Sequence, residues 1–360
     1  MPADSFCLEK MRLKCLALEN RPKKVRHGES EIKIRKMKAK LDRQKAPKLL
    51  DCTLRDGGIV NDSNFEDDFV RHAVRACADA RFDFIEVGFC DSERFCSPQK
   101  YGKWRFCRSA DIAEVLADKP REIKIAALAD AGKCDWRDFP AKSETPIDLM
   151  RCAFYRENTA EAVDIANSCA DKGYSTALCM MAATTLSERE LEDSLQKFSK
   201  TQADIIYLMD SFGALVPERT RRMSRAYAAA AHSSGKLFAI HCHNNLQCTF
   251  ANTLAAVECG ADMVDCTIGG LGKGAGNCMS EMLAMYFDEK FDARPLLKFA
   301  QDRIVPMRAK YDWGFSIPYM LTGLNGIHPR PAMKFSEAKK GGENAGLEDF
   351  YGTLPPDFRP

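Results

Sequence analysis

Residues 47–58 read Pro-Lys-Leu-Leu-Asp-Cys-Thr-Leu-Arg-Asp-Gly-Gly, and the rest of the chain is organised around this stretch. Residues 48–54 form a short, mostly apolar run, which is typical of a buried strand. Arg55 and Asp56 end this run, and the two glycines after them permit a sharp turn. In parallel α/β proteins the chemistry lies at this end of the strands. An adjacent arginine and aspartate are also common as a surface ion pair, so this stretch leaves both interpretations open.

From residue 48 onward the chain alternates apolar strands with amphipathic helices. The expected strands cover residues 48–54, 82–89, 122–128, 147–154, 175–181, 204–208, 237–241 and 263–268. Helical signals follow most of them, at residues 65–80, 109–118, 158–172, from 187 onward, 217–232, 246–257 and 277–287. Eight such units in about 240 residues predict a (β/α)8 TIM barrel. A doubly wound sheet is the alternative, but the glycine fingerprint that usually follows its first strand is absent.

The composition is that of an ordinary globular protein, with 45% hydrophobic and 29% charged residues among 360. No apolar run reaches the roughly 18 residues that a membrane span needs, and no secretory signal is visible. The sixteen cysteines are scattered and form no Cys-x-x-Cys pair. This favours small buried thiols in a reducing compartment over disulfides or a zinc cluster. We therefore expect a cytoplasmic protein with no membrane partner.

The net charge of +2 is unevenly distributed. Residues 1–48 hold 15 Lys and Arg against 6 Asp and Glu, a net +9, which leaves −7 for the other residues. We predict a basic N-terminal extension at 1–46, a TIM-barrel catalytic domain at 47–288 and a helical or irregular C-terminal segment at 289–360. The extension could be an arm for an anionic partner such as RNA. We favour a solvated appendage instead, with no nucleic-acid partner.

A second stretch, Ala-Ile-His-Cys-His-Asn-Asn at 239–245, follows the seventh expected strand. His241 and His243 are two residues apart on extended backbone, so their side chains point to the same side. At the mouth of a barrel that side is the lumen, where the carboxylate of Asp56 also lies. Two imidazoles and a carboxylate make a plausible site for a divalent metal ion with open positions for substrate. A lone His-x-His is a weak signal, but its combination with Asp56 favours the metal.

Three motifs together resemble those of the DRE-TIM metallolyase superfamily, the HMGL-like barrels. They are Leu-Asp-Cys-Thr-Leu-Arg-Asp-Gly-Gly at 50–58, His-x-His at 241–243 and Gly-Leu-Gly-Lys-Gly-Ala-Gly-Asn at 270–277. The match is closest to the branch of 4-hydroxy-2-oxovalerate aldolases and covers about residues 48–290. The resemblance implies a divalent-metal-dependent aldolase or lyase that makes or breaks a C–C bond next to a 2-oxo acid.

The resemblance also implies roles for individual residues. Asp56, His241 and His243 correspond to metal ligands, Asn277 to a further ligand, and Arg55 to the catalytic arginine. Cleavage beside a ketone leaves an enolate, whose charge a metal ion and an arginine can neutralise as it forms. Mn²⁺ is the expected ion, with Mg²⁺, Co²⁺ or Zn²⁺ as alternatives. The expected partners are a small 2-oxo acid and an aldehyde, and a homo-oligomer is compatible with the sequence.

The general base is where the sequence departs from the aldolases, which carry a histidine three residues after the motif aspartate. That position is Ile59 here. The proton of a 4-hydroxyl group must then go to another residue. Glu86 is the best placed candidate, although a structural role is equally open for it, and Tyr155 and His328 are the others.

Three further residues are candidates for substrate binding. Arg151 lies on the fourth expected strand and could bind a carboxylate or pair with an acidic neighbour. Asp210 and Ser211 end the sixth strand, where a simple turn before the next helix is the alternative. At the level of function, a Claisen-type acyl-CoA transferase of the isopropylmalate or homocitrate synthase kind and a non-catalytic barrel also stay open. The aromatic residues at 311–319 could cap the barrel mouth or pack beneath it.

Overall fold

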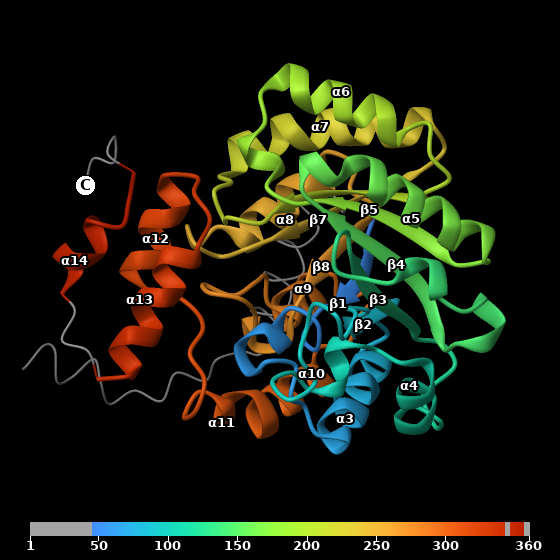
Figure 1. Ribbon diagram of the computed structural model, residues 1–360, viewed down its shortest axis with the longest axis horizontal. Helices are drawn as coiled ribbons and strands as arrows, with labels where there is room; N and C mark the ends of the chain where they lie inside the picture. Colours follow the sequence, from blue (N-terminus) through green and yellow to red (C-terminus); the bar gives the residue numbers. More distant parts are fainter. Residues whose placement is uncertain (1–44, 343–345, 356–360) are drawn as a thin grey trace, which may run out of the picture. The chain divides into compact units, whose positions relative to one another are not determined.

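Eight parallel strands close into a barrel in chain order, as the sequence predicted (Figure 1). The structure, a computed structural model, describes residues 45–342 and 346–355, and all of these except Lys45 belong to one unit, Ala46–Pro360. The predicted extension at 1–46 therefore lies almost wholly outside the described residues. The strands are β1 (Lys48–Asp51), β2 (Phe84–Phe89), β3 (Lys124–Asp130), β4 (Ile147–Phe154), β5 (Ser175–Met180), β6 (Ile205–Asp210), β7 (Leu237–Cys242) and β8 (Met263–Cys266). Pairing of β8 with β1 closes the barrel.

Helices follow seven of the eight strands and cover the outside of the barrel. They are α3 (Asp67–Asp79), α4 (Ser109–Val115), α5 (Thr159–Asp171), α6 (Glu188–Phe198), α7 (Pro217–Ser233), α8 (Thr249–Glu258) and α9 (Ser280–Tyr286). Between β3 and β4 the described chain forms only the short 3-10 turns η3 (Trp136–Asp138) and η4 (Lys142–Glu144). The helix starts follow local chemistry: Ser187 and Glu190 form a capping box at α6, and Pro217 begins α7.

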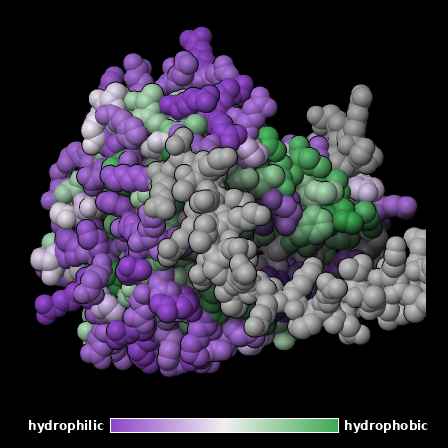
Figure 2. Space-filling model, turned by 180° about the vertical axis from the view of Figure 1, so that it is seen from behind, coloured by the Kyte–Doolittle hydropathy of each residue, from purple (hydrophilic) through white to green (hydrophobic). Residues whose placement is uncertain are grey.

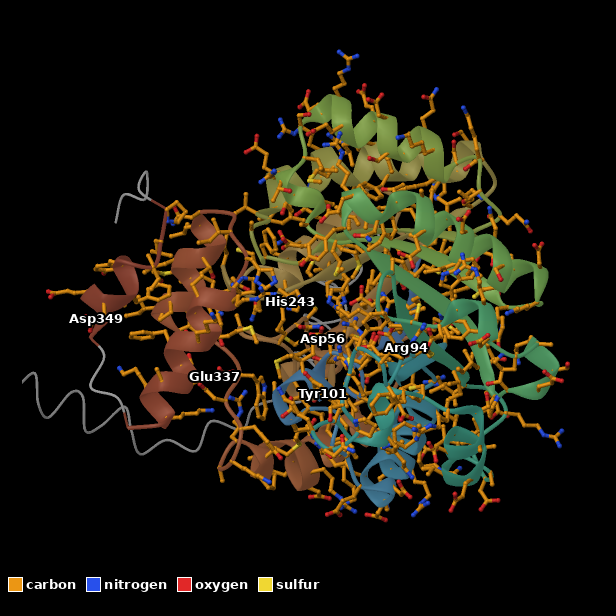
Figure 3. All side chains as sticks on the ribbon, in the orientation of Figure 1. Asp56, Arg94, Tyr101, His243, Glu337 and Asp349 are labelled. Carbon is orange, nitrogen blue, oxygen red and sulfur yellow. The ribbon has the colours of Figure 1, made fainter. Side chains whose placement is uncertain are left out.

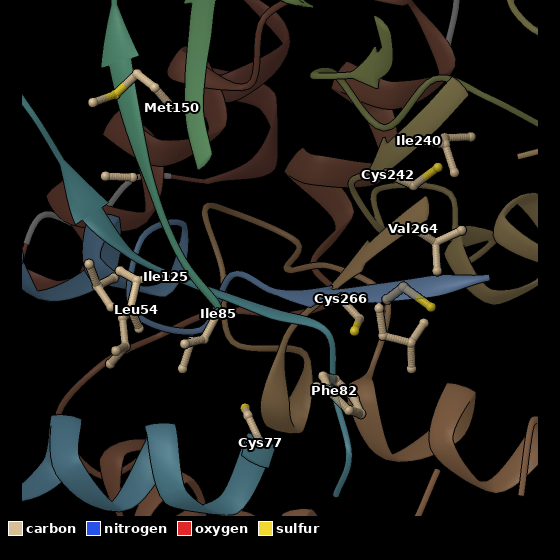
Figure 4. Packing of buried hydrophobic residues seen from close by; sticks show 14 of the residues in the cluster. Leu54, Cys77, Phe82, Ile85, Ile125, Met150, Ile240, Cys242, Val264 and Cys266 are labelled. Atoms are coloured by element: carbon tan, nitrogen blue, oxygen red, sulfur yellow. The ribbon is translucent and has the colours of Figure 1, made fainter. Parts of the chain in front are cut away.

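Alternation along the strands separates two buried layers. Side chains such as Ile85, Ile125 and Val264 face the surrounding helices and form one apolar cluster with residues of those helices such as Cys77 of α3 (Figure 4). The residues between them face the barrel interior, where a second apolar cluster includes Leu50 and Tyr207. Because strand side chains alternate with a period of two, the polar residues Glu86, Arg151, Tyr207, His241 and Asp265 all fall on the interior side.

The C-terminal segment begins against the outer helices, where Phe299 contacts Phe69, and continues to the loops at the barrel mouth. It comprises α10 (Arg294–Phe299), the π-helical turn η8 (Ala300–Ile304), α11 (Val305–Met307), α12 (Ile317–Leu324), α13 (Arg330–Lys340) and α14 (Leu347–Tyr351). Asn245, after β7, donates its side-chain amide to Tyr319 O at 3.0 Å and to Thr322 Oγ1 at 3.3 Å. The aromatic segment therefore lies at the mouth. The segment at 289–360 was predicted as helical or irregular, and the structure places α10 to α14 in it.

The surface is polar over most of the barrel helices, and a hydrophobic area lies over the C-terminal segment (Figure 2). Phe315, Ile317 and Leu324 are among the exposed large apolar side chains there. In the part of the chain that is described, no helix combines the length and the apolar character that a membrane crossing requires. Its fourteen cysteines are free thiols and twelve of them are buried, which agrees with their expected role as small apolar residues.

Candidate metal centre

Arg55 and Asp56 lie in a tight turn just beyond β1 rather than at the end of a longer strand. The strand ends at Asp51 because its carboxylate accepts from the amide of Thr53 at 2.9 Å, which turns the chain, and from Ser280 Oγ at 2.6 Å. The amide of Asp56 then donates back to Cys52 O. The expected strand over 48–54 is thus three residues too long, but its end still delivers Arg55 and Asp56 to the barrel mouth.

The structure brings Asp56, His241 and His243 together at this mouth, as the sequence predicted. One side-chain ligand atom from each lies within 4.8 Å of the others, and all three residues are buried. Asp56 and His243 lie near one another in Figure 3. The two imidazole rings meet edge to face at 5.1 Å. Asn277 is adjacent, because its backbone bridges to His243 and its side-chain nitrogen lies 3.5 Å from His241 Nε2.

Asp265 of β8, which sequence analysis missed, orients His241. Its Oδ2 accepts from Nδ1–H of His241 at 2.9 Å, so the lone pair of Nε2 faces Asn277 and the other candidate ligands. A carboxylate behind a ligand histidine commonly fixes its tautomer in this way. Burial alone would raise the pKa of Asp265, but Arg151 and His241 hold it below its ordinary value. The sequence signal that could have identified Asp265 is an aspartate within an otherwise apolar strand, at a position that faces the barrel interior.

These residues fit a divalent metal ion. His243 Nδ1 and Asn277 Oδ1 are buried and have no hydrogen-bond partner among the described residues, and buried polar atoms are seldom left in this state. Gly272 keeps the space open, because a Cβ there would lie 2.4 Å from Asn277 Oδ1 and 2.8 Å from Asp56 Oδ2. Two imidazoles, a carboxylate and an amide oxygen form a mixed nitrogen and oxygen donor set of the kind such ions accept.

Electrostatics keep the donors in their binding forms. Burial raises the pKa of Asp56, but His243 and Arg55 outweigh burial and bring it well below its ordinary value, so the carboxylate is charged. Burial lowers the pKa of His243 to about 3 against the opposing charge of Asp56, so the imidazole is neutral near pH 7. A charged carboxylate and neutral imidazoles are the forms that bind metal ions.

Arg55 is fixed beside these donors with one nitrogen left over. Nε donates to Glu86 Oε2 at 2.6 Å and Nη1 to Asp56 Oδ1 at 2.7 Å. Nη2 is buried and has no partner among the described residues. Burial lowers the pKa of Arg55, but Glu86 and Asp56 outweigh it and raise the pKa above its ordinary value. The guanidinium is therefore a rigid cation with a free donor.

Glu86 and Arg151 lie deeper in the barrel, both with no exposed surface. Glu86 Oε2 accepts from Arg55 and from Arg151 Nη1, each at 2.6 Å, whereas its buried Oε1 has no partner in the described structure. Arg151 Nη2 donates to Asp265 Oδ2. The donors of Arg151 that point at these carboxylates are thus engaged within the protein.

Asp210 and Ser211 are engaged by neighbouring loops. Asp210 accepts from the amides of Ala214 at 2.9 Å and Leu215 at 3.3 Å, and burial raises its pKa to about 7 against these bonds. Ser211 Oγ accepts from the amide of Ala182 at 3.1 Å. These bonds shape the turn that follows β6. A substrate contact for the pair stays a prediction.

The positions considered for the general base differ in what they offer. Ile59 is half-buried and packs against the apolar interior cluster. His328 Nδ1 accepts from the amide of Arg330 at 2.9 Å, which puts its proton on Nε2, and burial lowers its pKa to about 4. Burial raises the pKa of Tyr155. None of these three places a free lone pair beside Arg55 as Glu86 Oε1 does.

Comparison with known proteins shows the family of the chain. The profile of the HMGL-like family matches residues 46–301. The chain belongs to the HMGL-like family. A relative from Thermomicrobium roseum, named 4-hydroxy-2-oxovalerate aldolase, is 32% identical over 243 residues, which span 68% of this chain and 67% of the relative. A second protein of that name, from a Roseiflexus species, is 34% identical over 68% of this chain and 70% of its own length.

Among solved structures, the N-terminal domain of a putative aldolase from Bacteroides vulgatus superposes with a TM-score of 0.69. It is 24% identical and the match covers 85% of this chain and all of that one, which shows a shared fold. The family and its relatives confirm the expected carbon–carbon lyase, a metal-dependent aldolase or lyase acting on small molecules. The family implies a divalent ion, and Asp56, His241 and His243 form a group able to hold one.

Proposed function

We propose that this HMGL-like enzyme binds one divalent ion through Asp56, His241, His243 and Asn277, and cleaves or forms the C–C bond next to a 2-oxo acid. Mn²⁺ is the ion we propose, since carboxylate and amide oxygens beside imidazoles suit a harder cation than thiolate sites do. The observation that carries the proposal is the free donor Nη2 of Arg55, buried next to three converging ligand atoms.

The metal ion, when bound, supplies a Lewis acid that withdraws electron density from the 2-oxo group. Arg55 donates from Nη2 to the enolate oxygen or the neighbouring carboxylate of the product. Its other nitrogens are held by Glu86 and Asp56, so the donor is in place before charge develops and needs no reorganisation. The burial of these groups excludes water, which strengthens each of these interactions.

Glu86 Oε1 is the acceptor we propose for the proton of the hydroxyl group. Its support is a buried carboxylate oxygen with no partner in the described structure, within the same ion-paired unit as Arg55. The alkyl side chain of Ile59 cannot take a proton. We therefore propose a 4-hydroxy-2-oxo acid other than 4-hydroxy-2-oxovalerate, the substrate in the name of the relatives, as the preferred substrate.

A screen for pyruvate release over short 4-hydroxy-2-oxo acids with Mn²⁺ tests the proposal. We expect turnover of at least one acid, slow turnover of 4-hydroxy-2-oxovalerate, and faster turnover of the latter by Ile59→His. Arg55→Lys should lose on the order of 10²-fold in rate, because a single ammonium cannot hold two carboxylates and a substrate oxygen. Borohydride should trap no substrate adduct on the chain, because the proposed mechanism forms no Schiff base between a lysine and the substrate.

Two results would count against the proposal. If no acid of the panel releases pyruvate faster with the enzyme than with Mn²⁺ alone, the proposed activity is wrong. An efficiency of about 10⁴ M⁻¹s⁻¹ or more on 4-hydroxy-2-oxovalerate with the unmodified chain, a value typical of a dedicated enzyme, would remove the substrate distinction drawn from Ile59.

A further inference from the structure

Arg151 of β4 is a fully buried arginine that spans the barrel interior. Its Nη1 donates to Glu86 of β2 at 2.6 Å, and its Nη2 donates to Asp265 of β8. The guanidinium carbon lies 4.3 Å from the ring centre of Tyr207, and Tyr207 OH donates to Asp265 Oδ1 at 3.0 Å. The orientation of the guanidinium is thus fixed from three strands.

Each carboxylate that Arg151 contacts also holds a group of the proposed site. Glu86 Oε2 accepts from Nε of Arg55 at 2.6 Å, and Asp265 Oδ2 accepts from Nδ1 of His241 at 2.9 Å. A continuous series of bonds therefore runs from Arg55 through Glu86, Arg151 and Asp265 to His241. The two ends of this series are the proposed enolate-stabilising donor and a proposed metal ligand.

We propose, on the basis of the function proposed above, that Arg151 is a positioning residue that orients Arg55 and His241 together. It acts on Arg55 through Glu86 and on His241 through Asp265. A planar guanidinium can donate to two carboxylates in different directions, which a lysine ammonium on a flexible stem does not reproduce. The proposed role therefore explains why this position holds an arginine and why the arginine is buried.

The alternative is that Arg151 only fills the interior and neutralises two buried acids. In that case any replacement that keeps the charge and the fold should leave the ligands unaffected. The positioning role predicts instead that losing the second donor disturbs the metal site although the charge is retained. Arg151→Lys separates the two, because lysine keeps the cation and can contact only one of Glu86 and Asp265 closely.

The test is a titration of the purified, metal-free chain with Co²⁺, monitored by the visible absorption of the bound ion. Steady-state kinetics are measured alongside, with a 4-hydroxy-2-oxo acid that the unmodified chain cleaves. We expect Arg151→Lys to bind Co²⁺ about 10- to 100-fold more weakly, which is the usual effect of losing a group that orients a metal-binding histidine. The absorption spectrum of the bound Co²⁺ should also change. The turnover number should fall at least about 10-fold with a smaller change in KM, since Arg55 acts in the transition state.

Arg105→Lys is the matched control, because Arg105 pairs with one carboxylate, Asp91 at 2.6 Å, outside this series. It should bind Co²⁺ like the unmodified chain. Should Arg151→Lys fail to fold, Arg151→Met combined with Glu86→Gln removes one cation and one anion together, a change that buried pairs often tolerate. The same weakening of Co²⁺ binding is expected there.

The outcomes separate this inference from the proposed function. If the unmodified chain binds no Co²⁺, both are overturned. If it binds Co²⁺ and a folded Arg151 variant gives the same affinity and the same spectrum, the positioning role is overturned and the proposed function stands.

Discussion

Replacing Glu281 with glutamine should change how the stability of the chain depends on pH. Glu281 is buried at the start of α9, and its two carboxyl oxygens accept from the amide of Gly269 at 2.9 and 3.2 Å. It thereby anchors the glycine-rich loop that carries Asn277. Burial raises the pKa of Glu281 from 4.5 to about 7 against these bonds, with help from the charge of Asp51.

The sign follows from the raised pKa. Below pH 4.5 the carboxyl holds its proton in both the folded and the unfolded chain. As the pH rises toward 7 the unfolded chain releases the proton while the folded chain keeps it, so the free energy of unfolding falls. Each pKa unit is worth about 1.4 kcal/mol, so the loss between pH 5 and pH 8 is on the order of 2 to 3 kcal/mol. Glutamine keeps the shape and does not titrate.

Urea unfolding of the unmodified chain and of Glu281→Gln at pH 5 and pH 8 measures this directly. The quantity to compare is the change with pH, since the amide can alter the stability at both pH values. Between pH 5 and pH 8 the free energy of unfolding of the variant should fall by about 2 to 3 kcal/mol less than that of the unmodified chain. Equal losses in the two proteins would show that Glu281 does not keep its proton in the folded state and would refute the reasoning.

Two further predictions concern the support of the mouth. Asp265→Asn should weaken Co²⁺ binding by about 10- to 100-fold, because His241 loses the carboxylate that fixes its tautomer; unchanged binding in a titration would contradict that role. Gly213→Ala should cost about 1 to 3 kcal/mol more in urea unfolding than Gly235→Ala. Both glycines have positive φ, but a Cβ at Gly213 would lie 2.4 Å from Asn245 Oδ1, whereas one at Gly235 would meet no atom within 4 Å. Equal costs would show that the close approach of Gly213 to Asn245 does not contribute to the docking of the C-terminal segment.

The parts of the site that follow from local rules could be predicted from the sequence. Alternation along an extended chain puts His241 and His243 on one side, and the carboxyl ends of parallel strands meet at one mouth, so Asp56 could be assigned to the same place. The eight strands were predicted for the same reason, because each apolar run is a local signal. The end of β1 was misplaced because the turn there depends on the carboxylate of Asp51, which accepts from the amide of Thr53 and is held by Ser280, a residue far away in the sequence.

The pairing inside the barrel could not be predicted. Which interior residues meet depends on strand register and closure, and these join Glu86, Arg151 and Asp265 from positions far apart in the chain. The sequence therefore left open whether Arg151 binds a substrate carboxylate or pairs with an acidic neighbour, and Asp265 belongs to no motif that would have marked it. The segment at 289–360 was predicted only as helical or irregular, and the bounds of α12 to α14 depend on their packing on one another and on the mouth loops, which the sequence does not show.

The central claim is the metal site, and the metal content of the purified chain tests it most directly. Protein prepared without chelator should contain about one divalent ion per chain by elemental analysis, and an Asp56→Ala, His241→Ala double variant that is still folded should contain almost none, because a carboxylate and an imidazole of the three converging ligands are gone. Equal metal content in the two proteins would contradict the account.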